Sequence, residues 1–283
     1  MISKINLSVR PVHRDDRRRI ANLIQEPHVH RHLDWRPPLD WIGHQPFLVA
    51  ENDHDLVAVL ACPPDPPDVA WIRLLAISTD VDPYETWFSM WAIARERLVH
   101  LDDIVVAAIP LHDWFLDLLK ESDFTQVNTV IMLEWKRGQL PPARPSSPGS
   151  LRLMSYDDIP LVERLDNLSF NRLWCNSSDS LALAFNQAAV ATVAEIGGKI
   201  VGYQISTANH MGGHLARLAV HPEHQGRGIG YLLLRDLLMQ FERRGARRVT
   251  VNTQRDNLAS LALYEKANFH PTGEKFPVYQ YSS

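Results

Sequence analysis

The chain has 283 residues, of which 45% are hydrophobic, and its formal net charge is -4. This length allows a globular protein with two domains, and the slightly acidic balance argues against a nucleic-acid binder. No apolar run is long enough to span a bilayer, and the only two cysteines lack metal or redox spacing. These features predict a cytoplasmic protein that acts on neither membranes nor nucleic acids.

An internal repeat divides the sequence into two copies of one α/β unit. Arg10 corresponds to Arg152 and Phe124 corresponds to Phe269, so the offset grows only from 142 to 145 residues. Between the copies lies a segment rich in Pro, Gly and Ser, which is typical of a linker. We therefore predict a domain at 1–137, a linker at 138–150 and a domain at 151–283.

Each copy is predicted to begin with an extended segment and a helix, followed by a β-hairpin. The hairpins lie at 47–60 and 191–204, and Gly197-Gly198 supplies the positive φ angles of the second turn. A further strand and an amphipathic helix follow in each copy, and then another strand and a last helix. This order predicts an α/β fold with a mixed sheet in each copy.

The second copy contains a glycine-rich turn between a strand and a helix. The strand ends Leu218-Ala219-Val220, and the turn runs Gln225-Gly226-Arg227-Gly228-Ile229-Gly230 into a helix at Tyr231. Such a turn binds anions, because small residues admit a ligand and unpaired N–H groups point at it. A Rossmann dinucleotide site is excluded, since a hairpin precedes the strand and the next strand ends Asn252-Thr253 without an acidic residue.

A second motif follows the next strand and runs from Asn257 to Phe269, with Tyr264 seven residues after Asn257. Asn257 is a natural helix N-cap, and Tyr264 lies two turns further on the same face. Asn268 stands near the end of this motif and tolerates the left-handed conformation of a helix end. Together with the glycine-rich turn, the motif resembles the GCN5-related N-acetyltransferase superfamily, which usually has glycine in place of Asn268.

The resemblance implies two tandem acetyltransferase folds, with acetyl-coenzyme A as cofactor and coenzyme A as product. It implies that Leu218, Ala219 and Val220 pair with the pantetheine arm, that Gln225–Tyr231 wraps the pyrophosphate, and that Asn257 contacts the cofactor. Tyr264 would donate a proton to the departing thiolate. The predicted reaction is direct attack by an amine, either a small molecule or a peptide N-terminus, catalysed by a monomer or homodimer.

The general base is not identified by the sequence. Relatives that resemble ribosomal-protein N-terminal acetyltransferases often use a glutamate at the position of Asn252, which cannot accept a proton. Glu195 precedes a hairpin turn and is expected to face solvent. Three routes for removing the proton of the amine remain open. A water relay or a histidine such as His214 could accept the proton, or the acceptor amine could lose it without a strong base. The absent carboxylate also keeps an alternative function open, a non-catalytic acyl-coenzyme A sensor or interaction protein.

The first copy lacks the residues of the predicted site. Asp82 replaces Gln225, Glu85 replaces Gly228 and Trp87 replaces Gly230. Carboxylates repel a pyrophosphate and a tryptophan blocks close approach of the backbone, so we predict a degenerate first domain and an active second one.

A metal site is not predicted. His28, His30 and His32 alternate as on one face of an extended segment, but no cysteine or carboxylate completes a site at the usual spacing.

Overall fold

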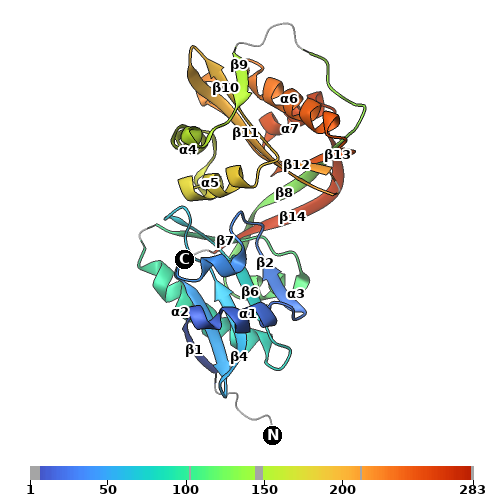
Figure 1. Cartoon of the computed structure of the whole chain (residues 1–283). Helices are drawn as coiled ribbons and strands as arrows, with labels where there is room; N and C mark the ends of the chain where they lie inside the picture. Colours follow the sequence, from blue (N-terminus) through green and yellow to red (C-terminus); the bar gives the residue numbers. More distant parts are fainter. Residues whose placement is uncertain (1–6, 102, 144–148, 211, 282–283) are drawn as a thin grey trace. The chain divides into compact units, whose positions relative to one another are not determined.

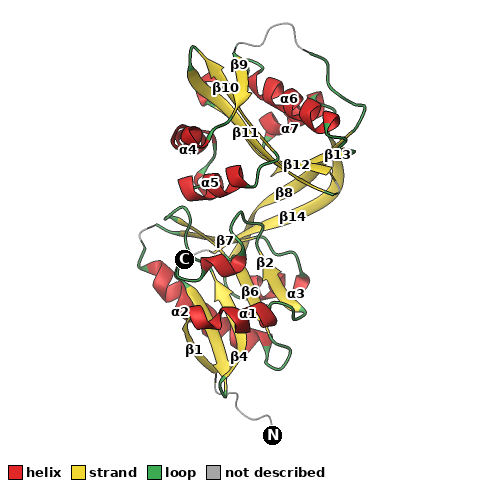
Figure 2. Cartoon of the chain, viewed as in Figure 1, coloured by secondary structure: helices red, strands yellow, loops and turns green. Residues whose placement is uncertain are grey.

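The computed structural model describes residues 7–101, 103–143, 149–210 and 212–281. The chain divides into two compact units (Figure 1). One comprises the chain up to Val127 with the segment from Pro277 onward, and the other comprises Asn128–Phe276. Each unit combines strands and helices (Figure 2), which confirms the predicted mixed α/β fold.

The first unit is built on an antiparallel sheet with the strand order β1-β3-β4-β6-β2. A smaller group of strands follows, in which β5 pairs in parallel with β7. The elements are β1 (Leu7–Pro11), η1 (Arg14–Asp16), α1 (Arg17–Leu23), β2 (His28–Arg31), η2 (Pro38–Trp41), β3 (Phe47–Asn52), β4 (Asp55–Ala61), β5 (Val69–Trp71), β6 (Leu74–Ile77), α2 (Pro83–Val99), β7 (Val105–Ala108), α3 (Asp113–Lys120) and the start of β8 (Phe124–Lys136).

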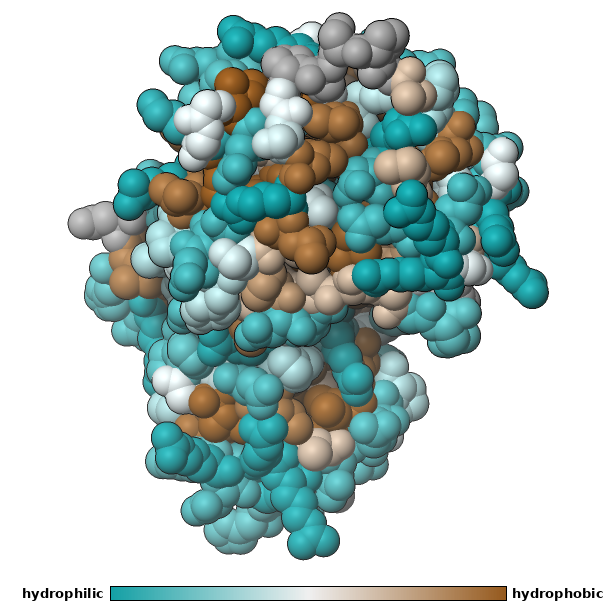
Figure 3. Space-filling model, turned by 45° about the horizontal axis from the view of Figure 1, so that its top comes forward, coloured by the Kyte–Doolittle hydropathy of each residue, from teal (hydrophilic) through white to brown (hydrophobic). Residues whose placement is uncertain are grey.

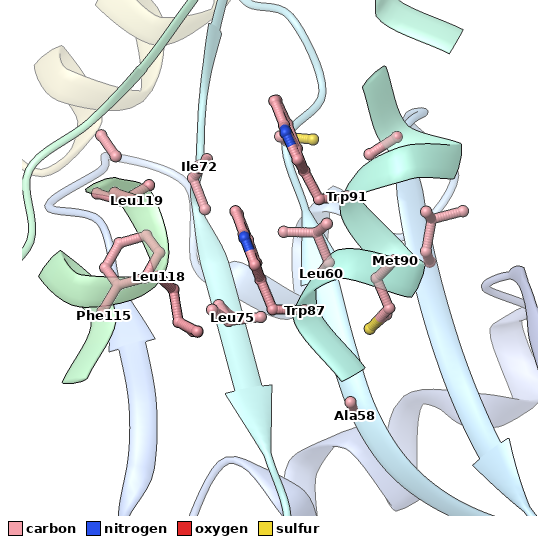
Figure 4. Packing of buried hydrophobic residues seen from close by; sticks show 14 of the residues in the cluster. Ala58, Leu60, Ile72, Leu75, Trp87, Met90, Trp91, Phe115, Leu118 and Leu119 are labelled. Carbon is pink, nitrogen blue, oxygen red and sulfur yellow. The ribbon is translucent and has the colours of Figure 1, made fainter. Parts of the chain in front are cut away.

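The core of the first unit lies on both faces of the antiparallel sheet. Successive residues of a strand point to opposite faces, so Leu48 and Val49 of β3 enter different clusters. Leu48 belongs to the cluster of Trp87 and Trp91 from α2, and Val49 packs in the cluster of Ile20 from α1. Figure 4 shows both tryptophans pointing from α2 toward the strands. The two helices therefore cover opposite faces.

The second unit has the strand order β14-β8-β13-β12-β11-β10-β9. In Figure 1, α4 and α5 lie on one side of β10, β11 and β12, and α6 and α7 lie on the other. The elements are β9 (Ser150–Leu153), η3 (Tyr156–Asp158), α4 (Ile159–Ser169), η4 (Arg172–Trp174), α5 (Ser178–Asn186), β10 (Val190–Ile196), β11 (Lys199–Asn209), β12 (Gly212–Val220), η5 (Pro222–His224), α6 (Ile229–Arg243), β13 (Arg248–Gln254), α7 (Leu258–Lys266) and β14 (His270–Tyr281).

The last strand of each sequence copy contributes to the unit of the other copy. β8 pairs with β13 from Val130↔Gln254 to Lys136↔Arg248, and β14 pairs with β7 at Tyr279↔Ala108 and Gln280↔Ala107. The predicted domains at 1–137 and 151–283 follow the repeat, whereas the compact units follow these strand pairings. The two divisions therefore differ in where they assign the ends of β8 and β14.

Part of the predicted linker at 138–150 packs against the second unit. The hydroxyl of Tyr231 donates a hydrogen bond to the carbonyl oxygen of Pro142 at 2.9 Å, and Nε of Arg235 donates to that of Pro141 at 3.0 Å. Both donors belong to α6, so the start of the segment is fixed along this helix. Residues 144–148 of the linker lie outside the described residues.

An ionic network joins the first strand, the first helix turn and the hairpin of the second unit. Arg152 donates two hydrogen bonds to Asp158 at 2.6 and 2.8 Å and a third to Glu195 at 2.8 Å. Asp158 also accepts from the backbone N–H of Ser155 at 2.8 Å. Glu195 is partly exposed, at 22%, and its carboxylate pairs with Arg152, a contact that the sequence did not predict.

The first unit contains the same network at the matching positions. Arg10 donates to Asp16 at 2.8 and 2.9 Å and to Glu51 at 2.8 and 3.0 Å. The hairpins also share an irregularity, since the pairing register shifts between Ala50 and Glu51 and between Ala194 and Glu195. Both the ion pairs and the bulge therefore follow the internal repeat.

The surface carries scattered apolar side chains. Leu153 and Leu168 are 70% and 58% exposed, and hydrophobic residues lie between hydrophilic ones on the face drawn in Figure 3. Such isolated exposure is ordinary for a folded protein and marks no binding site by itself. Within the described residues, no helix is long and apolar enough to cross a membrane.

We expect Asp158→Asn to lower the free energy of unfolding by about 1–3 kcal/mol, because it removes charged hydrogen bonds and a helix cap. Arg152 holds the pKa of Asp158 down to about 2. The stabilisation is therefore present above the unfolded-state pKa near 4 and is lost as the pH falls toward 2. Urea unfolding at pH 7 and at pH 3 measures both effects.

The matched control for this variant is Asp157→Asn, which neutralises the exposed neighbour. It should change stability by no more than about 0.5 kcal/mol. Equal effects of the two substitutions would contradict the assigned role of the network.

Candidate functional site

A bulge in β12 opens the sheet of the second unit. β12 pairs in parallel with β13 only from Gly213↔Val249 to Leu215↔Val251. Its pairing with β11 continues to Gly202↔Val220, after a register shift that leaves Ala216 unmatched. A bulge bends a strand and increases its twist, so β12 diverges from β13 beyond this point. Within the described chain, Leu218–Val220 pairs with a strand on one edge only.

The glycine-rich turn lies at the end of this free edge. Gly226 and Gly228 have φ angles of 74° and 87°, a left-handed conformation that favours glycine. Gly228 is the N-cap of α6, and the first hydrogen bond of the helix runs from Leu232 N to Gly228 O at 3.0 Å. The N–H groups before Leu232 are therefore outside the helical ladder, at the positive end of a 15-residue helix.

Gly230 is required for a different reason. A Cβ atom at this position would lie 3.2 Å from Leu263 Cδ2 on α7 and 3.6 Å from Val220 Cγ2. Even the smallest side chain would therefore crowd the contact between α6 and α7. Nearby, Nε2 of Gln225 donates to the carbonyl oxygen of Val220 at 3.0 Å, which closes the turn onto β12.

These elements surround a pocket of about 420 Å³. Phe170 lines it from the α4 side, and α7 contributes Asn257, Ser260 and Leu263 from the other side. Of the predicted cofactor-binding residues, those that line the pocket are Leu218, Ala219, Val220, Gln225, Gly226, Gly228, Ile229, Gly230, Tyr231 and Asn257. Arg227 and Tyr264 do not line it.

The pocket also contains residues that the sequence analysis did not single out as contacts. Ser260 and Leu263 follow Asn257 at intervals of three residues, so helical periodicity could have identified them. Lys266, one turn further on, adds a positive charge to the lining. The ring of His224 lines the pocket, and its Nδ1 is buried without a hydrogen-bond partner among the described residues.

Asn257 has the structural role expected of a helix N-cap. Its Oδ1 accepts a hydrogen bond from Ser260 N at 3.1 Å, and Asn257 also lines the pocket. At the other end of the motif, Asn268 has a φ angle of 65°, so the asparagine adopts the left-handed conformation predicted for it.

Tyr264 is the buried residue of α7 and is 5% exposed. Its ring lies 5.6 Å from that of Phe269, measured between centroids. Burial raises the pKa of Tyr264 above its ordinary value, so the hydroxyl is protonated at neutral pH. The phenol is therefore neutral, and burial makes loss of its proton less favourable than for an exposed tyrosine.

The residues considered as a general base have different surroundings. Asn252 has a buried Oδ1 with no hydrogen-bond partner in the described part of the chain. His214 on β12 has Nδ1 2.9 Å from Thr250 Oγ1 on β13, and burial lowers the pKa of this histidine. The lowered pKa makes this imidazole a weaker base than an exposed histidine, and His214 is not among the pocket residues. Glu195 is held by Arg152 and is not among the pocket residues.

In the first unit, the matching strand edge is occupied. β6 pairs with β4 at Ala58↔Ile77 to Ala61↔Leu74, and with β2 on its other edge at His28↔Ile77 to Arg31↔Leu74. The histidines thus lie in an extended segment, as predicted, and His30 is buried with Nε2 3.0 Å from the carbonyl oxygen of Ile72. The sequence pattern did not reveal that this segment pairs with the edge of β6 that corresponds to the pocket edge of β12.

The helix start of the first unit is also filled from within the chain. Asp82 is the N-cap of α2, and its Oδ1 accepts a hydrogen bond from Glu85 N at 2.8 Å. Trp87 is fully buried, and its Nε1 donates to Ser122 Oγ at 2.7 Å. A carboxylate therefore caps the helix start that corresponds to the glycine-rich turn of the second unit, and an indole takes the place of Gly230.

Comparisons with known proteins agree with this geometry. The model of a family described as "Acetyltransferase (GNAT) family" matches residues 159–269. Acetyltransferase SG1711 of Sodalis glossinidius (strain morsitans) is 30% identical over 124 residues, which are 42% of this chain and 85% of that protein. Acetyltransferase ECA0875 of Pectobacterium atrosepticum is 31% identical over 124 residues, 42% of this chain and 86% of that protein.

Solved structures share the fold over nearly the whole chain. A GCN5-related N-acetyltransferase from Sphaerobacter thermophilus has a TM-score of 0.63 and 17% identity, and the match covers 97% of this chain and 95% of that one. A tandem GNAT protein from the clavulanic acid biosynthesis pathway has a TM-score of 0.64 and 16% identity, with 97% and 98% covered. The bulged strand and the glycine-rich turn are consistent with the similarity to these relatives. The similarity shows that the chain belongs to the acetyltransferase (GNAT) family.

Proposed function

We propose that the second unit binds acetyl-coenzyme A and transfers its acetyl group to an amine. The observation that carries this proposal is the pocket in which the free edge of β12 meets the start of α6. Gly226 and Gly228 place no side chain between the helix start and a bound pyrophosphate, and the helix dipole favours negative charge there. The unpaired edge at Leu218–Val220 offers backbone groups to the amides of a pantetheine arm.

Acetyl-coenzyme A, when bound, supplies an activated thioester for attack by the acceptor. The chain contributes binding and proton transfer around that reaction. Burial keeps Tyr264 protonated at neutral pH, and it also makes the proton harder to release to a thiolate whose thiol has a pKa near 8.5. We assign to Tyr264 the donation of its hydroxyl proton to the departing thiolate, which requires the hydroxyl to contact the bound cofactor next to the pocket.

The acceptor must lose a proton to react. At pH 7, neutralising a lysine-like amine with a pKa near 10.4 costs about 4–5 kcal/mol, whereas an α-amine with a pKa near 8 costs roughly 1.4 kcal/mol. Because Asn252 replaces a carboxylate, an acceptor of lower basicity fits this site better. A peptide N-terminus, or a small amine with a similarly low pKa, is therefore the proposed class of acceptor.

We propose that the first unit is a degenerate copy that does not bind acetyl-coenzyme A. β2 occupies the edge that would pair with pantetheine, and Asp82 caps the helix that would receive the pyrophosphate. The same proposal assigns residues 1–137 and 151–283 to the two copies, with 138–150 as the connection between them.

Gly228→Glu should weaken binding of acetyl-coenzyme A by about 100-fold or more, because like charges placed side by side cost several kcal/mol. Gly228→Asn is the matched control, since asparagine tolerates the left-handed conformation without adding charge. Calorimetric titration of both variants measures the difference. Unchanged affinity in Gly228→Glu would contradict the assignment of the turn.

Tyr264→Phe should lower kcat by about 100-fold while leaving the affinity for acetyl-coenzyme A nearly unchanged, as expected when a general acid is removed. Thiol release in a panel of amines measures kcat, and titration measures affinity. A protein that binds acetyl-coenzyme A, turns over no amine and does not respond to this substitution would instead be an acyl-coenzyme A sensor.

A further inference from the structure

One chain segment adopts different structures in the two units. His28–Arg31 forms β2 on the free edge of β6. With the repeat offset of 142 residues, its counterpart is 170–173, since 28 + 142 = 170. In the second unit this segment forms no strand. Phe170 is extended, with φ -114° and ψ 152°, and the turn η4 follows at Arg172–Trp174.

The difference decides whether one edge of the strand is open, at Leu74–Ile77 of β6 in the first unit and at Leu218–Val220 of β12 in the second. We call the space beside this edge the groove. In the first unit, Leu74–Ile77 pairs with β4 on one edge and with β2 on the other. In the second unit, the matching Arg217–Val220 pairs with β11, and the other edge belongs to the pocket. An unpaired strand edge readily accepts another extended segment, so the open groove requires something that keeps 170–173 away.

Arg217 makes the contacts that hold this segment. Its Nε and Nη2 donate to the two carboxylate oxygens of Asp166, each at 2.7 Å, and Nη2 also donates to the carbonyl oxygen of Trp174 at 2.5 Å. The guanidinium carbon lies 3.5 Å from the centroid of the Phe170 ring. One side chain on β12 therefore fixes both ends of the segment.

Asp166 is fully buried and completes the arrangement. It accepts a hydrogen bond from the hydroxyl of Tyr203 on β11 and another from Asn176 N at 3.0 Å. The side chain of Arg217 is 13% exposed, so the pair lies largely out of water. A bidentate arginine–carboxylate pair with these additional bonds has one favoured geometry.

The first unit has apolar residues at both positions of the pair. By strand pairing, Leu74 corresponds to Arg217, because Leu74 pairs with Ala61 and Arg217 pairs with Ile205 at matching places in the hairpins. With the offset of 142 residues, Ile24 corresponds to Asp166. The first unit has a buried ion pair of its own, between Arg73 and Asp34, but this pair lies one residue before Leu74 and beyond the end of β2. It therefore leaves His28–Arg31 paired with β6.

We propose that Arg217 and Asp166 are positioning residues that hold 170–174 out of the groove and thereby keep the cofactor edge of β12 open. The pair also sets Phe170 as a wall of the pocket. This inference rests on the proposed binding of acetyl-coenzyme A by the second unit.

The test replaces the network with apolar residues in the triple variant Asp166→Ile, Tyr203→Phe and Arg217→Leu. Replacing all partners together leaves no buried charge unpaired, which such sites often tolerate. We expect the affinity for acetyl-coenzyme A to fall by about tenfold or more, since only the open fraction of molecules can bind. Hydrogen exchange should slow in the amides of 170–174 and 218–220 as these segments pair.

Two further variants serve as controls in the full-length protein. Arg164→Leu removes an exposed arginine from the same helix and should alter neither affinity nor exchange. Arg217→Lys keeps the charge opposite Asp166 but lacks the planar fork that also reaches Trp174. It should weaken binding by about threefold, because it shifts the same equilibrium partly toward the filled groove. This variant tests the positioning role if the triple variant does not fold.

The outcomes separate the two proposals. If the native protein binds acetyl-coenzyme A and the folded triple variant binds it equally well with unchanged exchange, the positioning role is overturned and the proposed function stands. If the triple variant does not fold and Arg217→Lys binds as tightly as the native protein, the positioning role is also overturned. If the native protein does not bind acetyl-coenzyme A, the proposed function fails, and this inference fails with it.

Discussion

The divergence of β12 from its parallel neighbour is the constraint on which the second unit depends. The unmatched Ala216 ends the pairing with β13, while the pairing with β11 continues for several residues. Backbone groups at a sheet edge must find partners or remain exposed to water. The bulge therefore creates a strand edge that can bind a ligand, and the positive end of the α6 dipole lies beside that edge.

The two units show how one fold keeps or fills such an opening. Arg10 and Arg152 make equivalent ion pairs with the first helix turn and the hairpin. These interactions maintain the scaffold and are independent of the groove. In the first unit, β2 pairs with the edge of β6, and the carboxylate of Asp82 caps the start of α2. In the second unit, we propose that acetyl-coenzyme A binds at both of these places.

Local sequence patterns predicted the features that depend on neighbouring residues. The hairpins, the positive φ angles of Gly197 and Gly198, the left-handed conformation of Asn268 and the N-cap at Asn257 follow from backbone preferences. Features set by distant residues were not predicted. The pairing of Glu195 with Arg152 and the insertion of β2 beside β6 depend on tertiary contacts that no short pattern encodes. The same limit applies to the exchanged pairings of β8 and β14, because strand partners are chosen by the whole sheet.

We expect the second unit of the chain to bind the cofactor and the first unit not to bind it. Calorimetric titration of the full-length protein with acetyl-coenzyme A tests this expectation most directly, when combined with hydrogen exchange in the same samples. The account predicts about one cofactor per chain, with slower exchange in 218–231 and unchanged exchange in 74–87. Binding of two cofactors per chain, or protection of 74–87 in place of 218–231, would contradict it.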